Sequence, residues 1–234
     1  MRRSFLATIA LVPVLATPLV VGGAQTRGDA AGRLGDALER MENTTARLEM
    51  SAVAQVKGSE ALGGGFDQRV HAVGELVPPD RLHLMVDGAG RVQELVIIGQ
   101  RMWVDAGDGM RIMSKVSLGP LGRPAAPLQF LRGPGVAEFA GFGLARGVVT
   151  YRVRMRLDSS ELQARMSSDQ PVDPDSRGTV EVEIGLFDGL VRRQTFEVIE
   201  PTDPFSGTGL DAVRTTYTIE YWDHGKHLEV REPK

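Results

Sequence analysis

The sequence predicts a mainly β (α+β) protein: a curved antiparallel sheet of about ten strands, with an N-terminal helix and short helices covering its concave face. Two observations support this prediction. Apolar residues alternate with period two through residues 69–113, and short turns rich in Gly, Pro and Asp interrupt the alternation. Turns this short leave no room for crossover helices, so successive strands should pair. Because a single sheet of this length must curl, one apolar face should line a concavity.

Residues 1–24 have the features of an export signal. A pair of arginines begins the segment, residues 5–21 are almost entirely apolar, and small residues precede a cleavage point after Ala24. We therefore expect a cleaved signal peptide at 1–24 and a single domain at 25–234, exported to a periplasm, a cell envelope or the extracellular space. Retention of residues 1–24 as an uncleaved membrane anchor is the alternative that the sequence leaves open.

The composition excludes several classes of partner and site. The chain has no cysteine, so it forms no disulfide, no thiolate metal site and no thiol nucleophile. Its formal net charge is −3 and it has no run of basic residues, which argues against a nucleic-acid partner. Stability must then come from the hydrophobic core, and we expect a monomer without a cofactor.

No catalytic constellation is legible in the sequence. The motifs G-x-S-x-G and H-E-x-x-H are absent, as are paired carboxylates beside a histidine in a glycine turn. Among the four histidines, His224 and His227 flank a turn, but a charged hairpin tip explains them more simply than a zinc site. We therefore predict a non-enzymatic protein without a metal site.

The elements outside the central meander follow from the same patterns. An amphipathic helix is expected at 29–41 with Asp29 as its N-cap, and a strand with one wet face is expected at 47–57. Residues 58–65 should form a glycine-rich hairpin tip. One or two helical turns are expected at 158–166, capped by Asp158 or by Ser159-Ser160 with Glu161. The remaining strands are expected at 148–157, 179–187, 190–200, 213–222 and 227–231.

Residues 114–147 interrupt the strand pattern. Their prolines forbid a long helix, so short helical turns are expected at 127–132 and 136–144. The segment holds too many apolar side chains for a solvated loop, and these should cover part of the sheet. They either plug one end of the core or form a movable lid over a cavity. The candidate lid residues are Leu128, Phe130, Leu131, Phe139 and Phe142.

The order of several short motifs resembles a known family. Pro79-Asp80-Arg81-Leu82-His83-Leu84 and the stretch Glu94–Val104 follow the N-terminal helix, and Tyr221–Pro233 ends the chain. This order is similar to the LolA-like lipoprotein-carrier superfamily, most closely its LppX/LprG-type bacterial envelope lipid-binding proteins. The resemblance implies a half-open antiparallel barrel covered by helices and non-catalytic binding of lipids, acyl chains or lipoproteins. The chain lacks the cysteine that is acylated in the lipoprotein branch, which leaves membrane tethering open.

The predicted ligand site is the concave apolar face of this half-barrel. In residues 92–98 both the odd-numbered and the even-numbered positions are largely apolar, so both faces of that strand should be covered. Methionines on or beside the meander suit a surface that accepts variable chains, although packing of a filled core is the alternative. The expected lining residues are Leu82, Leu84, Val86, Leu95, Ile97, Met102, Val104, Met110, Ile112, Val153 and Met155.

Three functions remain compatible with the sequence. The first is an exported carrier that binds a lipid or another hydrophobic acyl-chain ligand in the concavity by non-directional apolar burial. The second is an envelope sensor or regulator of the same fold, which signals to a membrane-protein partner. The third is a structural or interaction domain with a filled core.

Overall fold

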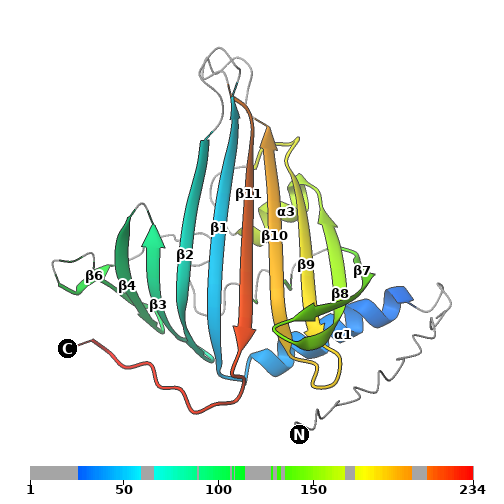
Figure 1. Ribbon diagram of the computed structural model, residues 1–234. Coiled ribbons are helices and arrows are strands. Elements are labelled where there is room, and N and C mark those ends of the chain that lie inside the picture. The colour runs from blue at the N-terminus through cyan, green and yellow to red at the C-terminus, as the bar shows by residue number, and fades with distance from the viewer. Residues whose placement is uncertain are drawn as a thin grey trace, which may run out of the picture.

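The computed structural model describes residues 26–58, 66–88, 90–105, 107, 109–113, 128, 131–132, 135–166, 172–201 and 210–233. Its strands form one antiparallel sheet in the order β6-β5-β4-β3-β2-β1-β11-β10-β9-β8-β7, which is curved and not closed into a barrel (Figure 1). The strands are β1 Ala46–Gly58, β2 Phe66–Val77, β3 Arg81–Gly88, β4 Arg91–Ile98, β5 Arg101–Asp105, β6 Arg111–Met113, β7 Ala137–Ala145, β8 Val148–Leu157, β9 Arg177–Gly185, β10 Val191–Pro201 and β11 Leu210–Trp222. The predicted fold class is therefore confirmed.

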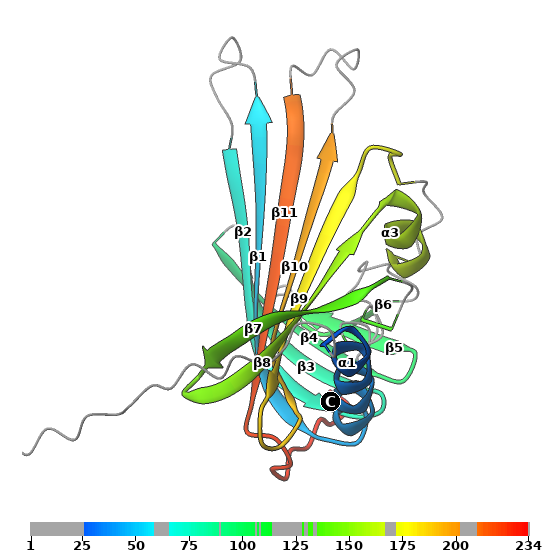
Figure 2. The ribbon, with the colours of Figure 1, turned by 90° about the vertical axis from the view of Figure 1, so that its right-hand side faces the viewer.

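Helix α1, Thr26–Met41, supplies the first layer over the sheet. Its apolar stripe is buried in the same core as the inner face of the sheet, and it packs against β7, β9 and β10 (Figure 2). The expected N-cap is wrong, because Asp29 lies about one turn inside the helix. Its carboxylate instead accepts a hydrogen bond from Nε of Arg33 at 3.0 Å, which is an i, i+4 pair on the helix surface.

Helix α3, Ser159–Met166, covers the far end of the concave face. Its N-terminus is a capping box in which Asp158 is the cap, one of the two alternatives expected: the amide of Glu161 donates to Oδ1 of Asp158 at 2.9 Å, and the amide of Asp158 donates to Oε2 of Glu161 at 3.0 Å. Leu162 is fully buried over β9 at Gly178, where an added Cβ would lie 2.7 Å from a methyl carbon of Leu162. Glycine therefore permits the close approach of helix and sheet at this point.

Charged residues line the outer face of the sheet in a ladder of ion pairs. The ladder runs across five strands through His71, Glu49, Arg146, Glu220, Arg193 and Glu183. Arg146 lies in the β7–β8 turn, and its guanidinium stacks on the ring of Trp222 with Cζ 4.0 Å from the ring centroid. The β7–β8 hairpin is thus bent over the outer face. Each surface ion pair of this ladder contributes no more than about 1 kcal/mol to the stability of the fold.

Two of the predicted elements are wrong. Residues 137–145 form edge strand β7, not the helical turn expected at 136–144, because they pair with β8 across the turn at Arg146. Residues 227–231 do not form a strand. The apolar side chain that suggested one, Val230, is buried on the outer face against Val96 and Trp103. Nη1 of Arg81 holds this tail by donating to the carbonyl of Val230 at 3.0 Å.

Candidate ligand-binding face

Cross-strand pairing gathers the predicted lining residues of the meander into rows. Leu84 pairs with Leu95, which pairs with Val104, while Leu82 pairs with Ile97, which pairs with Met102. Directly opposed residues of antiparallel strands point to the same side of a sheet, so these rows share the concave face. All six belong to or pack against the main hydrophobic core, and Val86 continues the face along β3.

The other half of the face comes from β8, β9 and β10. Val153 pairs with Val182, and Met155 pairs with Val180. Val180 in turn pairs with Phe196 on β10. These side chains are buried in the same core as those of the meander. The concave face is therefore one continuous apolar surface from β5 to β8.

The face becomes more accessible along β1, away from α1. Leu48 and Met50, next to the helix, are buried, whereas Ala54 and Val56 on the same side of the strand are only half-buried. Val56 pairs with Val213 of β11, which is also half-buried. Figure 1 shows β1, β2, β10 and β11 rising well beyond α1. An apolar ligand could extend along this part of the face.

Two predicted lining residues lie on the opposite face. Ile112 pairs with Trp103, which faces outward with Val96, and Ile112 is 67% exposed. Met110 packs against the same outer cluster. Even-numbered residues of β5 pair with odd-numbered residues of β6, for example Met102 with Met113. The concave face of β6 therefore carries its odd-numbered side chains, whereas the expected lining residues are even-numbered.

The candidate lid residues do not form one element. Leu128 and Leu131 are buried in the core, whereas Phe139 and Phe142 belong to β7. A bulge in β7 at Ala140 places both phenylalanines on the same side of the hairpin as Tyr151, with the Phe139 ring centroid 4.7 Å from that of Tyr151. Phe130 lies outside the described residues. Movement of this segment as a lid stays a prediction.

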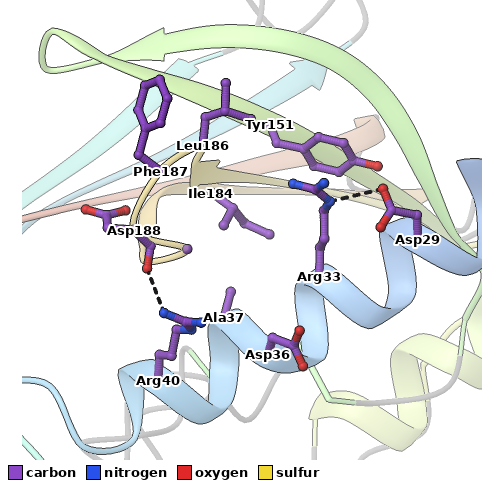
Figure 3. A pocket seen from close by; sticks show the side chains of 12 residues that line it. Asp29, Arg33, Asp36, Ala37, Arg40, Tyr151, Ile184, Leu186, Phe187 and Asp188 are labelled. Atoms are coloured by element: carbon purple, nitrogen blue, oxygen red, sulfur yellow. Dashed lines mark hydrogen bonds and ion pairs between the residues drawn. The ribbon is translucent and has the colours of Figure 1, made fainter. Parts of the chain in front are cut away.

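A pocket of about 340 Å³ opens between α1 and the β9–β10 turn (Figure 3). Its sheet side is largely apolar, with Tyr151, Ile184, Leu186 and Phe187. Its helix side is largely charged, with Asp29, Arg33, Asp36 and Arg40. The amphipathic pattern of the helix places Arg33, Asp36 and Arg40 opposite its apolar stripe. The spacing of the four charged residues indicates that they share one side of the helix. It does not indicate that the β9–β10 turn lies opposite that side.

Most of the charged side chains of the pocket form ion pairs, hydrogen bonds or ring contacts. Arg33 forms an ion pair with Asp29, and its guanidinium lies over the ring of Tyr151, with Cζ 4.7 Å from the ring centroid. Nη1 of Arg40 donates to the carbonyl of Asp188 at 3.1 Å. Burial raises the pKa of Tyr151, with Asp29 adding to the effect, so its hydroxyl stays protonated at neutral pH. The pocket thus offers an apolar wall beside a balanced set of charges.

Comparison with known proteins identifies the fold. No known family profile matches the sequence, and no curated protein matches it. Among solved structures, the Mycobacterium tuberculosis lipoprotein LppX superposes with a TM-score of 0.57 at 11% sequence identity, covering 87% of this chain and 99% of LppX. The chain has the LppX-type fold.

Two further solved structures are similar at lower scores. Mycobacterium bovis LprF has a TM-score of 0.49 at 10% identity, covering 91% of this chain and 99% of LprF. A LolA superfamily protein from Nitrosomonas europaea has a TM-score of 0.34 at 12% identity, covering 86% of this chain and 94% of its own. Neither helix of the LppX-type domain that the structure describes is long and apolar enough to span a membrane.

His224, considered above as a zinc ligand, forms hydrogen bonds within the LppX-type domain through both of its ring nitrogens. Its Nε2 donates to the carbonyl of Val191 at 3.0 Å, and its Nδ1 accepts from Nη1 of Arg192 at 2.7 Å. Throughout the described part of the chain, no three or more His, Asp or Glu side chains are grouped so as to hold a metal ion. His224 is therefore a neutral structural histidine in this arrangement.

Acidification is expected to destabilise the protein through His224. Burial, followed by the charge of Arg192, lowers the pKa of His224 below its ordinary value of 6.5, despite the opposing effects of the hydrogen bond to Val191 and of the charges of Asp188 and Asp223. The unfolded chain therefore binds the proton more tightly, so stability is complete above about pH 6.5 and falls as the pH drops toward the folded-state pKa. Urea unfolding at pH 7.5 and 5.5 should show a smaller loss for His224→Gln than for the unchanged protein. An equal loss in both would contradict this assignment.

Proposed function

We propose that this chain is a non-catalytic, exported carrier that binds a lipid or another acyl-chain ligand on its concave face. The observation that carries the proposal is the continuous apolar surface from β5 to β8, which is partly exposed along β1 and β11 at Ala54, Val56 and Val213. Burying one methylene is worth about 0.8 kcal/mol, so about ten methylenes along this face would contribute about 8 kcal/mol before ordering costs. Such binding needs no directional polar contacts and tolerates different chains.

The fold supports the same proposal. LppX, whose fold the chain shares, is described as a lipoprotein, and a half-open sheet with one apolar face is suited to holding an acyl chain. The N-terminal sequence, with its apolar residues 5–21, favours export to the cell envelope. The sequence has no cysteine that could carry a thioether lipid anchor, so we propose a protein that is free to carry its ligand unless residues 1–24 are retained.

Mass spectrometry of an organic extract tests the proposal directly. The protein is exported, purified without detergent and extracted beside an unrelated exported protein of similar size. A lipid present at about one molecule per protein, and missing from the control, is the expected result. Because an expression host can lack the native lipid, uptake of fluorescent acyl-chain probes is measured in parallel. A clean extract together with no probe uptake would instead favour the structural or interaction domain.

A further inference from the structure

Four exposed apolar side chains gather beside the pocket at the α1 end of the sheet. We call this group the apolar rim: Phe142 (55% exposed), Leu144 (63%), Val149 (43%) and Phe187 (90%). The first three lie on the β7–β8 hairpin, and the last lies in the β9–β10 turn. Single exposed apolar residues are ordinary, but a contiguous group marks an interaction surface.

Three of the rim residues share one face of the β7–β8 hairpin, and the turn that carries Phe187 is bonded to the same hairpin. Leu144 pairs with Val149, and Phe142 pairs with Tyr151, so these side chains share one face of the hairpin. The amide of Leu186 donates to the carbonyl of Val149 at 3.0 Å, which places the turn that carries Phe187 alongside β8. Tyr151 and Phe187 both line the pocket, so the rim borders its mouth (Figure 3).

The exposure of Phe187 is not required by the turn. The turn is closed by backbone hydrogen bonds from Gly185 to Leu190 (2.8 Å) and from Gly189 to Gly185 (2.9 Å), and glycine supplies its positive φ at position 189. None of these features involves the phenyl ring. A polar residue would fit position 187 equally well, so the ring is free to contact a partner.

The chain outside the described structure points to the kind of partner. The strongly apolar residues 5–21 precede α1, which begins at Thr26, and Asp29, about one turn later, already lines the pocket. Until residues 1–24 are cleaved, a segment suited to a bilayer is therefore joined to the chain shortly before the helix that lines the pocket. The acidic and basic residues of the pocket are nearly balanced, so the surface lacks the excess of cations that would select anionic lipids.

We propose that the apolar rim docks into the interfacial region of a lipid bilayer and places the mouth of the pocket against the membrane. Phenylalanine and leucine side chains at hairpin tips would enter the headgroup and acyl boundary, with burial of apolar surface as the driving force. The proposal does not depend on the carrier function. A protein that docks on membranes and holds no acyl chain would refute the carrier function alone.

Depth-dependent quenching tests the proposal at the residue concerned. Phe187→Trp is made in the exported chain and mixed with phosphatidylcholine vesicles that contain acyl-brominated lipid. Ile112→Trp is the matched control, because Ile112 is 67% exposed on edge strand β6 outside the rim. We expect quenching of the added fluorescence in the F187W protein and little in the I112W protein, after subtraction of the signal from Trp103 and Trp222. Equal quenching in the two proteins, or none in either, would overturn the proposal.

Vesicle sedimentation adds a second readout. Phe187→Ser combined with Leu144→Ser should reduce the affinity for phosphatidylcholine vesicles at least about tenfold, since burial of each side chain is worth about 1.5–3 kcal/mol and 1.4 kcal/mol is a factor of ten. Ile112→Ser combined with Val92→Ser is the control and should change it little. Binding that requires anionic lipid and disappears at high salt would show an electrostatic surface instead and reject the rim as an apolar dock.

Discussion

Replacement of Ala54 by tryptophan is expected to abolish acyl-chain uptake while the sheet remains folded. Ala54 lies on the concave side of β1, between Thr215 of β11 and Gln68 of β2, and it is half-buried. An indole at this position would occupy the accessible part of the face that the ligand is proposed to use. Because the site is not fully packed, the stability penalty should stay at or below the usual 1–3 kcal/mol of an overpacked core. Titration with a fluorescent fatty acid measures the loss of uptake.

Val53→Trp is the matched control for this experiment. Val53 is the neighbouring residue of the same strand, is also half-buried, and points to the outer face. It should retain uptake, whereas a folded A54W protein with unchanged uptake would contradict the proposed ligand face. Charged replacements of Leu84 or Ile97 test the same idea less cleanly. Both side chains are buried in the core, so a charge there would unfold the protein before it blocked a ligand.

Gly74→Ala is expected to lower the free energy of unfolding by at least about 3 kcal/mol. Gly74 lies in β2 where the curved sheet brings β3 very close: an added Cβ would be 1.8 Å from the carbonyl oxygen of His83 and 2.8 Å from a methyl carbon of Leu84. A backbone oxygen cannot rotate away, so strand β3 itself must shift. In a domain of this size such a loss lowers the melting temperature by about 6–12 °C. Thermal unfolding followed by circular dichroism measures the change.

Gly35→Ala is the control, and its expected effect has the opposite sign. Gly35 lies on the exposed side of α1, and an added Cβ would meet no atom within 4 Å. Alanine in a helix interior is more stable than glycine by about 0.5–1 kcal/mol, so this variant should melt slightly higher. Similar melting temperatures for the two variants would show that the curvature at Gly74 is relaxed in solution.

Local pattern was sufficient for most strands because alternation and turn chemistry act over a few residues. The β9–β10 hairpin follows from Asp188-Gly189, and the α3 cap follows from Asp158 and Glu161. The alternation also placed Leu84 and Ile97 on one face, because each short turn of the meander allowed the parity to be followed from strand to strand. That chain of inference failed at the β5–β6 turn, where the expected inward-facing residues, Met110 and Ile112, belong to the outer face.

Local sequence pattern could not predict the segments whose conformation depends on contacts with residues far away in the chain. Strand β7 pairs along its length with β8, and neither its glycines nor its two phenylalanines distinguish an edge strand from a loop. The tail around Val230 alternates like a strand but packs on the outer face against Val96 and Trp103. In both cases the local propensity is weak and tertiary contacts decide the conformation.

The sequence by itself determined the mainly β class, the apolar inner face and the absence of any thiol chemistry, because hydrophobic periodicity and composition are local properties. Only the tertiary structure decided which residues share that face in β6, how the β7–β8 hairpin bends, and that α1 and the β9–β10 turn enclose a pocket bordered by Phe187. The reason is geometric: sheet curvature and turn parity accumulate over many strands. Residues more than a hundred positions apart, such as Arg40 and Asp188, meet only once the sheet has curved around its core.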